Sequence, residues 1–178
     1  MIEIIELALP GVKKIKLRDF SDSRGFFQET YRKPVYAKNG ILCDFVQDNH
    51  SFSEKGTLRG MHYQSEPGQA KLVTPIVGTI YDVFVDIRPA SPTFGKWGAA
   101  TLSSENHEQI FIPEGYAHGF AVVSESAHVC YKVSTVFDPA TECTFRYDDP
   151  AIGIDWPFDH PILSEKDALA PTFGELQL

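Results

Sequence analysis

The chain has 178 residues, of which 43% are hydrophobic and 22% charged, and its 16 basic and 24 acidic side chains give a formal net charge of −8. This composition predicts one globular domain over residues 1–178 and excludes a disordered or fibrous chain. It also excludes the basic surface typical of nucleic-acid-binding proteins. Three cysteines without metal-site spacing favour a reducing cytoplasm. Uncharged runs fall short of the roughly 20 residues of a membrane helix, so we expect no membrane partner.

Short runs rich in β-branched and aromatic residues follow one another along the chain, separated by 13 glycines and 12 prolines. The clearest run, Tyr81–Arg88, alternates with a period of two, so both faces of a strand are specified. Helices are expected only over Lys33–Asn39, ended by Gly40, and over 164–169, with Ser164 as the N-cap. Many short strands predict an all-β sandwich or barrel with short peripheral helices. The predicted strands are 2–7, 12–17, 25–31, 45–52, 57–63, 71–77, 81–88, 109–112, 117–123, 129–133 and 143–147.

The first candidate for chemistry is His62, in the run GTLRGMHYQ, which is followed by Lys71. If 57–63 is a strand, simple alternation places Arg59 on one face and Gly60 and His62 on the other. Gly60 would then leave room beside His62 for a ligand or for another backbone. A core histidine with one satisfied hydrogen bond is the alternative interpretation.

The second candidate is His118, which follows a tight turn at Pro113–Gly115 and lies at the start of a strand. Loops and strand mouths are where barrels commonly bind ligands. Two histidines on two strands raise the question of a metal site. The position two after His62 is Gln64, whose amide is a poor ligand for a transition metal. We therefore expect no metal.

The remaining polar candidates each have an ordinary structural alternative. Tyr131 lies in a strand, where a buried tyrosine commonly packs and bonds one backbone group. Asp167 follows Ser164 and could act only as a helix-capping residue, but a tail folded over a barrel mouth could place it beside a histidine. The polar segments 20–29 and 47–51 need partners, which an oligomer interface or a ligand would supply.

Together these segments resemble the dTDP-4-dehydrorhamnose 3,5-epimerase family. Each match is weak alone, but they come in family order and extend from about Val12 to Asp167. The resemblance implies a double-stranded β-helix (cupin) barrel in a homodimer, with N-terminal strands exchanged or paired between subunits and without metal or cofactor. The matching segments are 22–29, 47–51, 56–64, 71–73, 83–88, 91–95, 112–120, 131–132, 148–150, 156–157 and 163–167.

The resemblance also implies an activity, the inversion of C3 and C5 of dTDP-4-keto-6-deoxy-D-glucose on the way to dTDP-L-rhamnose and cell-surface polysaccharide. In this family's chemistry His62 would be the base, oriented by Asp167. Tyr131 would be the acid on the opposite face, and Lys71 would stabilise the enolate. The implied substrate-binding residues are Arg24 and Arg59 for the diphosphate, Glu29, Gln47 and Asn49 as polar contacts, His118 beside the sugar, and Phe20 and Phe27 as aromatic walls.

One departure from the family pattern leaves alternatives open. We expect an aromatic residue at position 136, packed on the sugar, but the chain has Val136 there. One alternative is therefore a mono-epimerase, inverting C3 or C5 only, on a related nucleotide 4-ketosugar. An alternative from another class is a non-catalytic or metal-dependent cupin that binds a small ligand.

Overall fold

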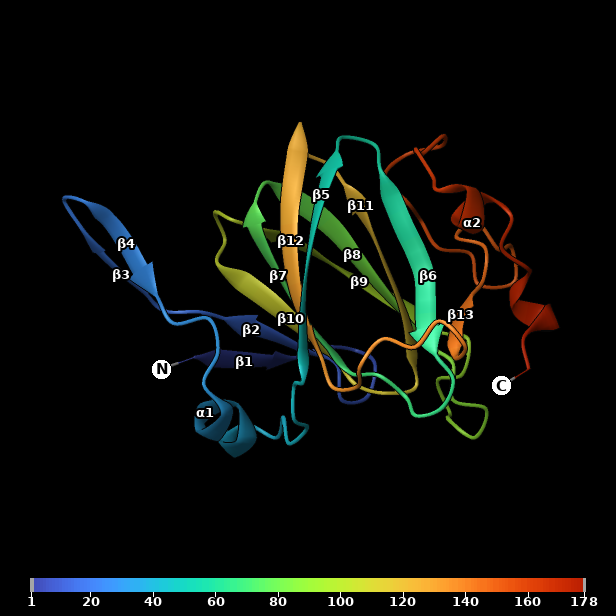
Figure 1. Ribbon diagram of the computed structural model, residues 1–178, viewed down its shortest axis with the longest axis horizontal. Coiled ribbons are helices and arrows are strands. Elements are labelled where there is room, and N and C mark those ends of the chain that lie inside the picture. Colours follow the sequence, from blue (N-terminus) through green and yellow to red (C-terminus); the bar gives the residue numbers. More distant parts are fainter. Residues whose placement is uncertain (1, 178) are drawn as a thin grey trace.

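The computed structural model describes residues 2–177, in which strands account for nearly all of the regular structure (Figure 1). The strands are β1 (Glu3–Glu6), β2 (Lys13–Lys16), β3 (Asp19–Asp22), β4 (Gly25–Gln28), β5 (Gln47–Glu54), β6 (Leu58–Gln64), β7 (Lys71–Val77), β8 (Thr79–Asp86), β9 (Trp97–Ser103), β10 (Glu108–Ile112), β11 (Tyr116–Val122), β12 (Ser126–Val133) and β13 (Glu142–Thr144). The helices are α1 (Lys33–Lys38), α2 (Glu165–Ala168) and the 3-10 turn η1 (Phe173–Glu175).

Two antiparallel sheets pack face to face, which confirms the predicted all-β double-stranded β-helix. The six-stranded sheet has the order β1-β2-β10-β7-β12-β5, and the five-stranded sheet has the order β13-β6-β11-β8-β9. Strands β3 and β4 pair only with each other and project from one side of the body (Figure 1). Every pairing between these strands is antiparallel, and most neighbours in a sheet are distant in sequence, as expected for this fold.

The sequence pattern missed β3 and β9. The centre of strand β9 is Gly98 and two alanines, and Trp97 and Thr101 are its only aromatic and β-branched residues, too few to mark a strand. Small residues are needed there because the Phe84 ring of β8 lies against them. A Cβ at Gly98 would come within 2.7 Å of Phe84 Cε2. Strand β3 is polar apart from Phe20 and exposed throughout, so no apolar alternation marks it in the sequence.

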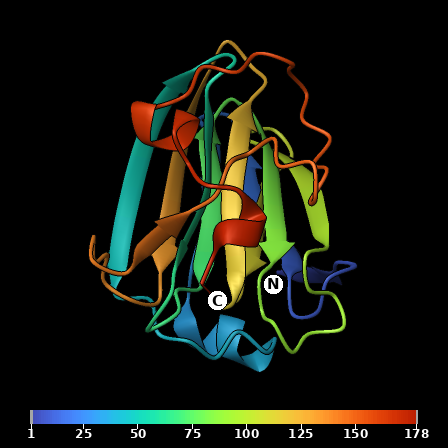
Figure 2. The ribbon, with the colours of Figure 1, turned by 90° about the vertical axis from the view of Figure 1, so that its right-hand side faces the viewer.

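The main core lies between the two sheets, and further apolar clusters cover part of the outer face of each sheet. The alternation predicted for 81–88 is confirmed, because Val83 and Val85 point outward while Phe84 points into the core. The C-terminal segment, red in Figure 2, crosses the outer face of the five-stranded sheet, where Trp156 packs edge-on against Tyr81. Burying one such large apolar side chain contributes about 1.5–3 kcal/mol to stability.

The two predicted helices are confirmed with their caps. Helix α1 has Asn39 as its C-cap and is followed by Gly40, and it covers part of the outer face of the six-stranded sheet through Tyr36. At α2 the Ser164 hydroxyl accepts a hydrogen bond from the Asp167 backbone N–H at 3.1 Å. Within residues 2–177 no helix has both the length and the hydropathy to cross a membrane.

Candidate active site

Two adjoining cavities, of about 310 and 240 Å³, open between the sheets and share the side chains of His62, Lys71, Tyr131 and Glu142. We call them together the barrel pocket. Strands of both sheets line it, so its geometry depends on the packing of the whole barrel. The other lining residues are Gln47, Asn49, Tyr63, Gln64, Gln69 and Phe137 in the first cavity and Ser51, Arg59, His118 and Phe120 in the second.

A bulge in β6 corrects the predicted alternation, which had put Arg59 and His62 on opposite faces. His62 pairs with His118 of β11, and Arg59 pairs with Phe120. Two residues of β6, Gly60 and Met61, therefore lie opposite one residue of β11, and the side chains of Arg59 and His62 turn to the same face and line one cavity. The extra residue is accommodated at Gly60, where a Cβ would come within 2.6 Å of the backbone of β11.

His62 and Asp167 form a hydrogen-bonded pair, because the C-terminal segment with α2 folds back over the barrel. Their Nε2 and Oδ1 atoms are 2.6 Å apart, and the aspartate is almost fully buried while the histidine is about one third exposed, at 31%. Burial raises the pKa of Asp167, but hydrogen bonds from His62, Ser164 and the Gly60 backbone outweigh burial and lower it below its usual value. An ionised carboxylate only accepts hydrogen bonds, so Nε2 carries the proton and Nδ1 is the basic nitrogen of His62.

Lys71 lies on the floor of the barrel pocket, where it is only 6% exposed. Its Nζ donates a hydrogen bond to the His62 carbonyl at 3.1 Å. Burial lowers the pKa of Lys71 to about 8, against the attraction of Asp82 and Glu142. The ammonium form therefore dominates at neutral pH, and it is placed to face negative charge that develops on a bound molecule.

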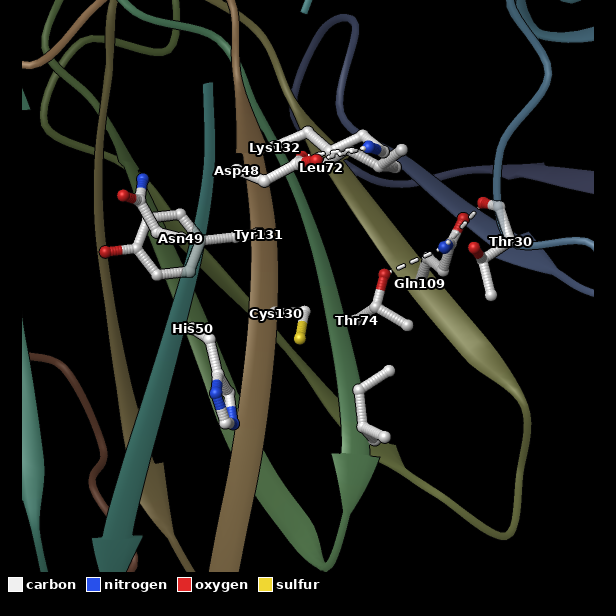
Figure 3. A pocket seen from close by; sticks show the side chains of 11 residues that line it. Thr30, Asp48, Asn49, His50, Leu72, Thr74, Gln109, Cys130, Tyr131 and Lys132 are labelled. Carbon is white, nitrogen blue, oxygen red and sulfur yellow. Dashed lines mark hydrogen bonds and ion pairs between the residues drawn. The ribbon is translucent and has the colours of Figure 1, made fainter. Parts of the chain in front are cut away.

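Tyr131 reaches the barrel pocket from β12 and is paired across the strands with Asn49 of β5. In Figure 3 the two side chains project together to one side of their strands, away from Thr74 and Gln109. Burial raises the pKa of Tyr131, with a smaller contribution from Glu142, while the charge of Arg59 lowers it. The phenol therefore keeps its proton at neutral pH and can donate it.

The predicted polar contacts Gln47, Asn49 and Arg59 also meet at the barrel pocket. The Gln47 amide donates to Asn49 Oδ1 at 2.8 Å, and Arg59 Nε donates to the Ser53 hydroxyl at 3.0 Å. These bonds fix the side chains at the pocket rim before any ligand arrives, and preorganised contacts lose less entropy on binding.

Four predicted substrate-binding residues do not reach the barrel pocket of their own chain. Phe20, Arg24 and Phe27 belong to the β3–β4 hairpin, on the opposite side of the molecule from β6 (Figure 1). Arg24 is paired with Asp22 at 2.5 Å within the hairpin, and Glu29 just beyond it is paired with Arg32 at 3.0 Å.

The aromatic residue expected at position 136 is supplied by the next position. Val136 is 62% exposed and is not among the lining residues, whereas Phe137 lines the barrel pocket. The Phe137 backbone N–H donates to Gln47 Oε1 at 2.9 Å, which holds this segment at the rim. Val136 therefore leaves no gap in the wall of the pocket.

Sequence reasoning missed two carboxylates at this site. Asp82 is fully buried and accepts a hydrogen bond from His118 Nε2 at 2.8 Å. An aspartate on the core face of an apolar strand needs a polar partner, and this signal was available in the sequence. Glu142 lines the pocket and is paired with Lys166 of α2; it lies one residue before the strand predicted over 143–147, and nothing in the sequence marked it as a pocket residue.

Within residues 2–177, no three or more His, Cys, Asp or Glu side chains are grouped so as to bind a metal ion. Gln64, two positions after His62, uses its Oε1 atom to accept a hydrogen bond from Gln69 at 2.9 Å.

The fold and the barrel pocket define the class of protein, a cupin-type barrel with acid–base side chains at its centre. A family model described as dTDP-4-dehydrorhamnose 3,5-epimerase matches residues 6–175. The chain belongs to this family, whose members are carbohydrate epimerases and hence isomerases.

Individual relatives agree with the family model. A dTDP-4-dehydrorhamnose 3,5-epimerase of Neisseria gonorrhoeae is 50% identical over 177 residues, covering 99% of this chain and 54% of that protein, so the chain spans about half of this relative. One of Salmonella typhimurium is 46% identical, covering 100% of this chain and 99% of that protein. The crystal structure of a dTDP-6-deoxy-D-glucose-3,5-epimerase from Legionella pneumophila with dTDP-4-keto-L-rhamnose has a TM-score of 0.97 and 44% identity, covering 99% of this chain and 95% of that chain.

Proposed function

We propose that this chain is a dTDP-4-dehydrorhamnose 3,5-epimerase that inverts C3 and C5 of dTDP-4-keto-6-deoxy-D-glucose in dTDP-L-rhamnose synthesis. The observation that carries the proposal is the His62–Asp167 pair, which shares one pocket with the Tyr131 phenol and the Lys71 ammonium. Inversion next to a ketone needs a base, an acid and a group that stabilises the enolate oxygen. The identity of the substrate is inferred from the family to which the chain belongs.

In the proposed reaction, His62 Nδ1 removes the proton from the carbon next to the ketone, and the C–H electron pair moves into the enolate. The Asp167 carboxylate stabilises the resulting imidazolium. The Lys71 ammonium stabilises the enolate oxygen, a contribution of about 3–4 kcal/mol by analogy with an oxyanion-hole donor. The Tyr131 hydroxyl then gives its proton to the same carbon from the opposite face, and solvent resets both groups. Well-placed acids and bases each contribute roughly 10²–10⁴ in rate.

The proposed binding roles follow the positions of the side chains. Arg59 would bind the diphosphate through its planar guanidinium, which suits phosphate oxygens. Gln47 and Asn49 would contact the substrate at the rim, and His118 would contact the sugar. Phe137 would pack on the sugar ring, the position that had been assigned to residue 136.

We also propose a cytoplasmic homodimer in which the β3–β4 hairpin serves the partner's barrel pocket. Phe20, Phe26 and Phe27 are 51%, 59% and 69% exposed, and an isolated two-stranded hairpin is marginally stable in water. The outer face of the six-stranded sheet carries a cavity of about 300 Å³ with Thr74 and Cys130 in its wall (Figure 3). A second copy on this face would cover the cavity. The substrate contacts of Phe20, Arg24, Phe27 and Glu29 would then be made in the partner's barrel pocket.

The proposed function is tested by incubation with dTDP-4-keto-6-deoxy-D-glucose in D₂O, followed by NMR or mass spectrometry. Deuterium at both C3 and C5, with the inverted ketosugar trapped by a downstream reductase, is the expected result. Deuterium at one carbon would identify the mono-epimerase instead. With no deuterium at either carbon, the chain would act on another nucleotide sugar or only bind a ligand.

A further inference from the structure

Asp82 is the carboxylate bonded to His118, which lines the barrel pocket, and the Asp82 side chain has no exposed surface. It lies on β8 between Ile80 and Phe84 in the alternation, on the face that packs into the apolar core. An ionised carboxylate is costly in such surroundings unless cations or hydrogen-bond donors compensate it.

The compensation of Asp82 is incomplete. Its Oδ2 atom accepts from His118 Nε2 at 2.8 Å, but Oδ1 is buried and has no hydrogen-bond partner within residues 2–177. Burial raises the pKa of Asp82, and the attraction of His118 and of the Lys71 ammonium acts against it. Lys71 lines the same cavity as His118, the residue that Asp82 holds, so its ammonium is the lysine or arginine charge that faces Asp82 across this part of the barrel.

The other charged and titratable groups around Lys71 differ from Asp82. Glu142 of β13 also attracts the ammonium, but it is partly exposed and is already paired with Lys166. The other titratable or charged side chains that line the pocket with Lys71 are His62 and Tyr63 of β6, His118 of β11, Tyr131 of β12 and Arg59, none of them a carboxylate. Unlike Glu142, Asp82 forms no ion pair with a lysine or arginine within residues 2–177.

We infer that Asp82 is a positioning residue, which keeps Lys71 in its ammonium form and turns His118 so that Nδ1 faces the substrate. The first effect follows from an uncompensated negative charge inside the barrel, where solvent screens little. The second follows because the carboxylate holds Nε2–H and leaves the other ring nitrogen available in the pocket. The inference rests on the proposed function, in which Lys71 must be charged to stabilise the enolate.

The test is the titration of Lys71, followed by NMR of ¹³Cε-labelled lysine, in the wild type and in Asp82→Asn. The asparagine keeps the shape and the acceptor for His118 but removes the charge. We expect Lys71 to lose at least about tenfold in proton affinity, one unit of pKa. Since the ammonium is the active form, the alkaline limb of kcat should move to lower pH by the same amount. Asp82→Glu, which keeps the charge, should restore most of the Lys71 pKa and most of the position of the alkaline limb of kcat.

Two matched variants separate this role from a general loss of stability. Asp149→Asn removes another buried carboxylate, far from the barrel pocket, and should leave the Lys71 titration unchanged. Glu142→Gln should lower the pKa of Lys71 less than Asp82→Asn does. If Asp82→Asn does not fold, Glu142→Gln can still be compared with the wild type. A tenfold or larger loss of Lys71 proton affinity in Glu142→Gln would make Glu142 the counter-charge and overturn the inference. An unshifted Lys71 in folded Asp82→Asn would overturn the inference. The NMR titration needs no turnover, so it stands even if the D₂O experiment fails.

Discussion

The barrel pocket and the β3–β4 hairpin hold the predicted site residues in opposite ways. In the pocket, His62, Lys71 and Tyr131 are carried by strands of two packed sheets, and His62 is also held by buried Asp167 and Lys71 by the His62 carbonyl. In the hairpin, Arg24 is satisfied only by its neighbour Asp22, and the phenylalanines face solvent. Under the proposed function, one chain therefore contains the complete acid–base set, whereas the hairpin residues would bind substrate only in the pocket of a second copy. The chemistry would then be fixed by the fold of one chain, and part of substrate binding would depend on assembly.

The largest effect is expected from His62→Ala, which removes the base from the barrel pocket. Exchange of the C3 and C5 protons should fall by roughly 10²–10⁴ or more, the contribution of a positioned base. Binding of dTDP, measured by calorimetry, should stay near the wild-type affinity because the nucleotide contacts are untouched. Wild-type exchange in this variant would remove His62 from its role.

A mixing experiment tests whether the hairpin serves the partner. Arg24→Ala and His62→Ala should each be weakly active alone. In a hybrid dimer, one pocket would combine an intact His62 with an intact Arg24 from the other chain. Refolding the two variants together should therefore restore a substantial part of the wild-type activity, and a mixture no better than its components would place Arg24 in its own chain's site.

Tyr131→Phe should separate the two halves of the reaction. It removes the proposed acid and leaves the base, so net inversion should fall by about 10²-fold or more while loss of substrate protons to solvent falls less. Both rates are read from one D₂O time course by NMR. Equal losses would argue that Tyr131 does not act on the opposite face.

The smallest contrast compares neighbours at the pocket rim. Phe137→Ala removes an aromatic wall and should raise KM several-fold and change the ratio of C3 to C5 exchange. Val136→Ala removes an exposed side chain and should stay within about 0.5 kcal/mol of the wild-type stability, with unchanged exchange. If the two variants behaved in reverse, the original assignment of position 136 would be restored.

Much of the fold could be predicted, because hydrophobic alternation is a local property of the sequence. Tyr81–Arg88 showed both of its faces, and Ser164 marked the start of a helix. The bulge that turns Arg59 toward His62 could not be predicted, because it depends on register against β11. Glu142 reaches the pocket only through pairing of β13 with β6, a contact between distant parts of the chain. The pairing of His62 with Asp167 likewise needed the tail to fold back, 105 residues further along the chain.

The bulge at Gly60 has a consequence for how this chain can vary. Gly60 has φ of +133°, and a methyl group there would meet Gly119 Cα of β11 at 2.6 Å; one on Gly119 would meet the Arg59 carbonyl and the Met61 sulfur at 2.8 Å. Neither glycine can gain a side chain without separating the two strands that carry His62 and His118. In a library of random substitutions, both positions should tolerate as little change as the acid–base residues do, although neither offers a group to the substrate. Intolerance to substitution here records the closeness of two backbones, so it should not be taken as a sign of chemistry.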